Sequence, residues 1–164
     1  MSLEKYLKEF KKAAQLLDTK PFNEKNIQIQ TGIWLDAVVL RIQKRHWANN
    51  PEEKPHSGAA IFMSIWLDEK SITNQRILYN MHALRLRQLN NYKLQSRAFA
   101  NSFRKKLTPV KKLWPNISTD FAPQTLMEGW TTLSPQNLQN DIFQLANNFL
   151  SIENLVEKTL LEFK

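Results

Sequence analysis

Residues 59–67 read AAIFMSIWL, and this stretch decides the fold class. It is apolar at nearly every position, which is typical of a strand buried on both faces. Residues 49–57 precede it and hold two prolines, two asparagines and two glutamates, a composition that predicts a loop. A loop of this length between two strands favours antiparallel pairing.

The partner strand is predicted in residues 27–47, where apolar and polar residues alternate. Val38, Leu40 and Ile42 are spaced two residues apart, as on one face of a strand. A helical interpretation of the same region is also open, but its β-branched residues favour a strand. We therefore predict a small, mainly antiparallel sheet over about residues 27–67.

Before and after the predicted sheet, apolar residues recur at the spacing of an α-helix. Leu3, Tyr6, Leu7 and Phe10 share one face of a helix that Ser2 caps. Further helices are predicted at about 71–90, 95–107 and 123–129, from Ser134 onward, and from Ser151 to the end. The fold class is accordingly α+β, in which an N-terminal helix and several C-terminal helices pack on the sheet.

Composition predicts one globular domain spanning residues 1–164. Hydrophobic residues make up 42% and charged residues 23%, ordinary values for a folded chain, and cysteine is absent. No stretch approaches the length of a membrane span, and no apolar leader opens the chain. These features lead us to expect a cytoplasmic protein that does not enter a membrane.

Charge is distributed unevenly along the sequence. Residues 71–119 contain ten Lys or Arg and no Asp or Glu, whereas the whole chain carries a net charge of +8. The last 45 residues show the opposite bias, with two lysines and six carboxylates. This segregation predicts a basic surface for an anionic partner, such as nucleic acid. Alternatively, these are ordinary solvated helix faces, partly neutralised by the acidic C-terminal helices.

The basic residues of the predicted helices fall on shared faces. Those of the second helix lie opposite Phe99 and Phe103, and several guanidinium groups together could hold phosphates in bidentate geometry. The predicted anion-binding residues are Arg76, Arg85, Arg87, Arg97, Arg104 and Lys105.

Arg85 differs from the others because a helix over 71–90 would place it beside Met81, inside the apolar arc. A buried arginine needs a partner, since an unpaired buried charge is costly. Two interpretations are open: an ion pair with Asp36, Asp68 or Asp120, or a position lining a pocket for an anionic ligand.

A metal-dependent nuclease is an alternative function. Asp36, Asp68 and Lys70 would lie near strand ends, in an arrangement similar to carboxylates that chelate Mg²⁺ beside a lysine. Asp68 would equally suit the start of a helix. The three histidines lack the spacing of metal ligands, so the sequence predicts no metal site of its own and no cofactor.

We therefore expect a binding domain whose basic helical surface contacts a polyanion. A protein-interaction or self-associating module is the third hypothesis. Trp114 and Trp130, near Lys111 and Lys112, are the tryptophans expected to be partly exposed, although core packing is the simpler interpretation for both.

Overall fold

The computed structural model describes residues 2–54 and 57–164, which form an α+β fold built on a five-stranded antiparallel sheet. The strands are hydrogen-bonded in sequence order, β1 to β5. The elements, in chain order, are α1 (Leu3–Gln15), α2 (Thr19–Glu24), β1 (Ile27–Trp34), β2 (Ala37–Lys44), β3 (Ala60–Leu67), α3 (Glu69–Thr73), β4 (Arg76–Leu84), α4 (Ser96–Leu107), β5 (Thr125–Thr132) and α5 (Leu138–Leu161).

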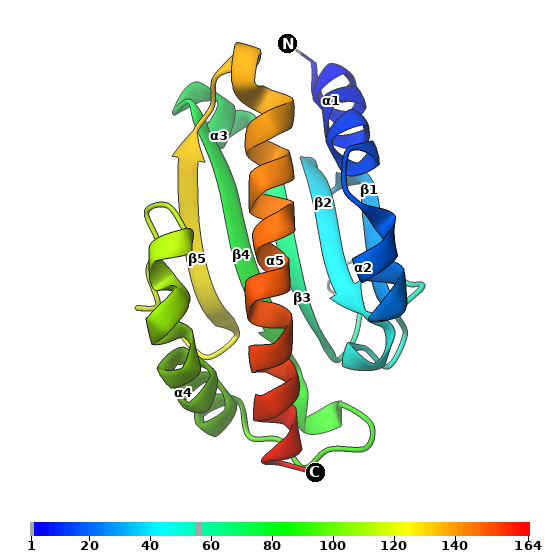
Figure 1. The fold of residues 1–164 in the computed structure, drawn as a ribbon, viewed down its shortest axis with the longest axis vertical. Coiled ribbons are helices and arrows are strands. Elements are labelled where there is room, and N and C mark those ends of the chain that lie inside the picture. The colour runs from blue at the N-terminus through cyan, green and yellow to red at the C-terminus, as the bar shows by residue number, and fades with distance from the viewer. Residues whose placement is uncertain (1, 55–56) are drawn as a thin grey trace.

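Helices α1, α4 and α5 lie side by side on one face of the sheet, as Figure 1 shows, with α5 crossing its centre. Most strand side chains that point to this face are apolar, above all in the central strands. In β3 they are Ile61, Met63, Ile65 and Leu67, all fully buried. Because side chains alternate along a strand, the remaining residues point to the opposite face, on which none of these three helices packs. We call that side the open face of the sheet.

The predicted sheet and its central strand are confirmed. Residues 60–67 form β3, which is buried on both faces, and β2 pairs with it antiparallel across the polar loop. The N-terminal helix is confirmed as α1, with the Ser2 side chain accepting a hydrogen bond from the Lys5 N–H. The sheet is nevertheless larger than predicted, because β4 and β5 extend it beyond residue 67.

The predicted helix over 71–90 is wrong. Of the described residues in this range, Glu69–Thr73 forms the only α-helix, Arg76–Leu84 is the strand β4, and Leu86–Gln88 is a 3₁₀ turn. Ile77, Tyr79, Met81 and Ala83 alternate along β4 and face the helices. Ile77 and Met81 are four residues apart, and this separation also fits one turn of a helix. Burial of this alternating face in a sheet prevails over local helix propensity.

Two further helix predictions are wrong. Residues 123–129 contribute to β5 instead of a short helix. Ser151 lies inside α5, which runs without interruption to Leu161, so no separate helix begins there. The predicted helix over 95–107 is confirmed as α4, and the predicted start near Ser134 corresponds to a 3₁₀ turn, Pro135–Asn137, that leads into α5.

Of the two interpretations for the late tryptophans, core packing describes Trp114 and partial exposure describes Trp130. Trp114 is buried and packs against Tyr79 with ring centroids 5.2 Å apart, whereas Trp130 is half-buried. Among the described residues, no helix is both long and apolar enough to cross a bilayer.

A charged network connects α5 to the end of β2. The buried indole of Trp47 donates a 2.7 Å hydrogen bond to Oε1 of Glu157, which also lies 2.7 Å from His46 Nε2 and 3.5 Å from Lys44 Nζ. Burial raises the pKa of Glu157, but the hydrogen bonds from His46 and Trp47 and the nearby positive charges outweigh it, and the pKa falls to about 2. The ionised carboxylate therefore holds α5 against this corner of the sheet.

We expect Glu157→Gln to lower the free energy of unfolding at pH 7 by about 1–2 kcal/mol. The folded pKa is lowered from 4.5 to about 2, so the stabilisation is fully present above the unfolded pKa. It is lost as the pH falls through this interval. Urea denaturation of both proteins between pH 7 and about pH 2 measures the effect. Glu69→Gln, at an exposed carboxylate on α3, is the control, and a difference that is constant with pH would contradict the prediction.

Candidate anion-binding site

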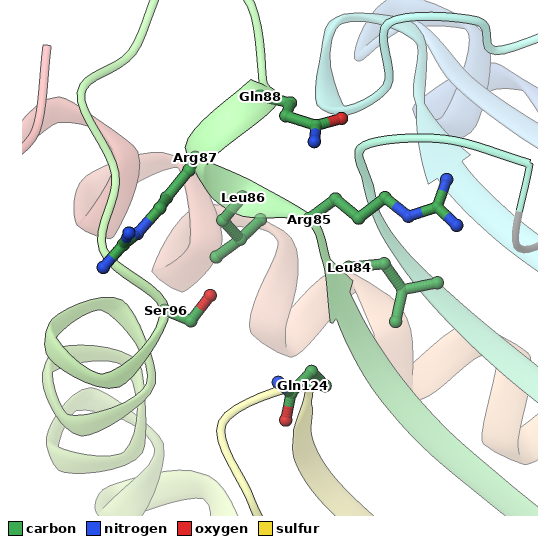
Figure 2. A pocket seen from close by; sticks show the side chains of 7 residues that line it. All are labelled: Leu84, Arg85, Leu86, Arg87, Gln88, Ser96 and Gln124. Carbon is green, nitrogen blue, oxygen red and sulfur yellow. The ribbon is translucent and has the colours of Figure 1, made fainter.

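A pocket of about 450 Å³ opens at the end of β4 and is shown in Figure 2. Its walls come from three segments: the turn that follows β4, the first residue of α4, and the residue just before β5. The lining residues are Leu84, Arg85, Leu86, Arg87, Gln88, Ser96 and Gln124. This lining contains two arginines and no acidic side chain, so its charge favours an anion.

The turn after β4 depends on an unusual backbone conformation. Arg85 has φ 50° and ψ 43°, in the left-handed region, and this reverses the chain into the 3₁₀ turn Leu86–Gln88. Gln88 N–H donates to the Arg85 carbonyl at 2.9 Å, and fully buried Leu86 anchors the turn to the core. A non-glycine residue in this region is strained, and such strain clusters at functional sites.

Arg85 itself is exposed and does not lie within an apolar helical arc as predicted, because the strand ends at Leu84. The expected ion pair with Asp36, Asp68 or Asp120 is wrong. Neither Arg85 nor Arg87 forms an ion pair or a side-chain hydrogen bond with any described residue. Of the two earlier interpretations, pocket lining is the one that describes Arg85.

The N-terminus of α4 contributes the third side of the pocket. Ser96 is its first residue, and the preceding Gln95 makes no side-chain hydrogen bond that would cap the helix. The first N–H groups of a helix have no partner within it, and they carry the positive end of the helix dipole. Such a terminus binds anions well when it faces a ligand.

Figure 2 shows how the polar side chains are arranged around the pocket. The Arg87 guanidinium points toward the start of α4, while that of Arg85 points to the opposite side. Ser96 and Gln124 lie between them, below the turn. The two arginines therefore flank the pocket without closing it, and both are exposed enough to change torsion angles when a ligand arrives.

The structure brings together only part of the predicted set. Arg97 is exposed in the first turn of α4, next to Ser96, whereas Lys105 is exposed more than two turns further along. Arg76 begins β4, at the opposite end of that strand from Arg85, and its guanidinium lies 3.9 Å from the centre of the Trp130 ring. The prediction that Arg76 and Arg87 share one face of a long helix is wrong, because Arg76 lies in strand β4 and Arg87 lies in the separate 3₁₀ turn Leu86–Gln88.

Arg104 has a structural set of contacts. Its Nε donates to the Leu126 carbonyl at 3.1 Å, and Nη2 donates to the carbonyls of Phe121 and Thr125 at 3.0 and 2.9 Å. Nη2 also approaches the Ala122 carbonyl at 3.4 Å. Burial lowers the pKa of Arg104, and the charge of Asp120 opposes this effect. Arg104 therefore ties α4 to the segment that leads into β5.

The acidic C-terminal helix leaves most of the basic segment without ion pairs. Of the ten basic residues in 71–119, only Lys106 forms an ion pair within the described chain, with Glu162 at 2.8 Å. Glu153 of α5 pairs instead with Lys44 at 2.5 Å and Lys25 at 3.5 Å, near the β1–β2 edge of the sheet. The positive charge around the pocket is thus free to act on a ligand.

The residues of the nuclease hypothesis have other local roles. Asp68 Oδ1 accepts a 2.8 Å hydrogen bond from Ser71 N–H and caps α3, which contains Lys70. Asp36 lies in the exposed turn between β1 and β2. Among the described residues, no group of three or more His, Cys, Asp and Glu could hold a metal ion. The protein-interaction hypothesis stays a prediction, as does the nuclease.

Ser96 and Gln124 are not among the residues predicted from the sequence. Ser96 could have been found from the predicted start of the second helix. Polar residues are common at helix starts, where the first backbone N–H groups have no partner within the helix. Gln124 could not, because its position depends on the pairing of β4 with β5. Comparison with protein-family models, with curated proteins and with solved structures finds no match to this chain.

We expect Arg104→Gln to lower the free energy of unfolding by about 2 kcal/mol, because several backbone carbonyls would lose their charged donor. Lys105→Gln on the same helix is the matched control, since Lys105 is exposed and makes no contact of this kind, and should change stability by less than about 0.5 kcal/mol. Urea denaturation measures both, and equal effects would contradict a structural role for Arg104.

Proposed function

We propose that this protein is a binding domain for an anionic, phosphate-bearing partner, with nucleic acid as the first candidate. One observation carries the proposal: Arg85 and Arg87 flank a pocket that contains the uncapped start of α4 and no acidic lining residue. The proposal is narrower than the six-residue surface expected from the sequence. It relies on the turn after β4 and on Arg97 nearby.

Three sources of positive potential act at this pocket. Two guanidinium groups can each donate paired hydrogen bonds to phosphate oxygens. The helix terminus adds unpartnered N–H groups and about half a positive charge. The surrounding basic segment forms few ion pairs, so its field extends into solvent and attracts polyanions from a distance of about one Debye length.

The proposal predicts that Arg85→Gln combined with Arg87→Gln weakens binding to a labelled single-stranded DNA. Each lost phosphate contact should reduce the slope of log K against log salt by about 0.7. The double variant should therefore lose about 1.4 from the slope and elute earlier from a heparin column. Fluorescence anisotropy at several salt concentrations measures the slope.

The control removes charge elsewhere. Lys11→Gln changes an exposed lysine on α1 that forms no ion pair among the described residues, so it should lower affinity less and leave the slope nearly unchanged. Absence of binding by the natural protein at low salt would end the proposal. If Lys11→Gln and Arg85→Gln alone reduced DNA affinity equally, the binding would depend on overall charge and not on the pocket. That result would also overturn the proposal.

Backbone strain at Arg85 gives a second test. Because glycine adopts the left-handed conformation without steric cost, we expect Arg85→Gly to retain the fold and to raise the free energy of unfolding by about 0.5 kcal/mol. It should weaken DNA binding at the same time. Thermal denaturation measures the change in stability, and the anisotropy assay measures DNA binding. Reduced stability together with unchanged binding would contradict both expectations.

A further inference from the structure

A second pocket, of about 300 Å³, lies on the open face of the sheet and shares no lining residue with the anion-binding pocket. Tryptophans form part of its wall, Ala37 and Val39 add apolar surface, and polar groups gather toward β4 and β5. The residues that carry the inference are Trp34, Trp66, Ser64, Asn80 and Glu128. A mainly apolar pocket with a few convergent polar groups is the usual form of a small-molecule site.

Strand register brings the polar residues together. Ser64 is opposite Asn80, and Asn80 is opposite Glu128, so the three form one row across β3, β4 and β5. Residues paired in this way point to the same face of a sheet. Trp66 is two residues beyond Ser64 and therefore faces the same side. This row is a product of the tertiary pairing and involves residues far apart in the sequence.

The position of Trp34 depends on a glycine. A Cβ atom at Gly32 would lie 2.7 Å from Cζ2 of the Trp34 ring, which is closer than real Cβ contacts come. The ring therefore lies over the backbone of β1 because residue 32 has no side chain. This placement puts an aromatic surface on the pocket wall.

The polar groups of the pocket offer acceptors. Asn80 is 3% exposed, and its Nδ2 is 2.9 Å from Nε2 of His82, which leaves Oδ1 buried without a hydrogen-bond partner among the described residues. A buried acceptor without a donor costs about 1–3 kcal/mol. A ligand that donates a hydrogen bond would remove this cost.

Glu128 supplies a negative charge next to that acceptor. It is half-buried and forms no ion pair with the described residues, while its backbone pairs with Asn80 on one side and with Ser118 on the other. Arg41, in the same row of the sheet, is engaged elsewhere. Its Nη2 donates to Gln30 and to the Glu53 carbonyl at 2.7 Å. Within residues 2–54 and 57–164, no Lys, Arg or His therefore forms an ion pair with this carboxylate, although His82 also lines the pocket.

We propose that this pocket binds a small organic cation that carries N–H donors, of the ammonium, amidinium or guanidinium class. The cation would pack on the indole surface of Trp34 or Trp66, where the ring quadrupole attracts positive charge. Its N–H groups would donate to Glu128 and to Asn80 Oδ1. A neutral ligand would leave the partly buried carboxylate unpaired, which makes a cation the occupant that fits the charge of the site.

Two sources could present this chemistry, a free small molecule or the side chain of a partner protein. Methylguanidinium represents the first source, and an arginine blocked at both ends represents the second. Binding of both would show that the mouth of the pocket admits a side chain. Binding of methylguanidinium alone would assign the site to free small molecules, and either result supports the proposal.

The main experiment titrates the protein with benzamidinium and compares it with benzamide, a neutral compound of nearly the same shape. Tryptophan fluorescence and the side-chain NMR signals of Trp34 and Asn80 report occupancy of the pocket. We expect benzamidinium to bind at least about tenfold more tightly than benzamide. Glu128→Gln should weaken benzamidinium binding by about tenfold or more, while Glu69→Gln on α3 should leave it unchanged.

Trp66→Leu is the second variant and should also weaken binding, so the test does not depend on the folding of Glu128→Gln alone. No saturable binding at millimolar benzamidinium would overturn the proposal. Benzamide binding as tightly as benzamidinium would do so as well, as would a Glu128→Gln variant that folds and binds normally. None of these outcomes affects the anion-binding pocket, whose test uses other residues and another ligand.

Discussion

The helices α1, α4 and α5 pack on only one face of the sheet, and the rest of the molecule is arranged around this constraint (Figure 1). The faces of β2, β3 and β4 that point toward these helices carry an unbroken set of buried apolar side chains. Burial of such side chains is the main favourable contribution to folding, so this face fixes the register of β2, β3 and β4. A shift of one residue would turn the apolar set outward. The strand residues that alternate with these apolar residues must consequently point to the open face, whatever their polarity.

The open face is polar along one row because its residues do not have to meet a helix. Arg41 stabilises one end of that row: it donates to the carbonyls of Pro51 and Glu53 and so holds the segment after β2 against the sheet. Burial lowers the pKa of this arginine, and the charge of Glu52 opposes the effect. At the other end of the row, no described segment is held over Asn80 and Glu128 by contacts of this kind. The same row therefore combines an arginine with internal partners and a carboxylate that has none among the described residues.

The sequence was sufficient to predict the α+β class, β3 and the two helices with clear caps or stops, α1 and α4. It was insufficient for β4, because Ile77 and Met81, four residues apart, satisfy a helical spacing as well as a strand spacing, and only pairing with β3 decides between them. Arg85 was placed inside a helix, and its left-handed backbone and exposed side chain could not be anticipated. Positions such as Gln124 and Glu128 depend on long-range register, for which a single sequence has no local signal.

The charge of the C-terminal helix explains why the basic segment stays uncompensated. Glu153 is almost fully buried and its carboxylate pairs with Lys25 and Lys44, while Glu157 binds His46, Trp47 and Lys44. These acids are thus engaged with the β1–β2 side of the sheet, where they fix the position of α5. Among the described residues, Glu162, just beyond the end of α5, is the one acid that pairs with the basic helix α4, through Lys106 and Ser102. Because ion pairs act over short distances, the arginines at the end of β4 are left with solvent as their neighbour. The segregation of charge in the sequence thus persists in the fold because the acids that could cancel it stabilise the opposite side.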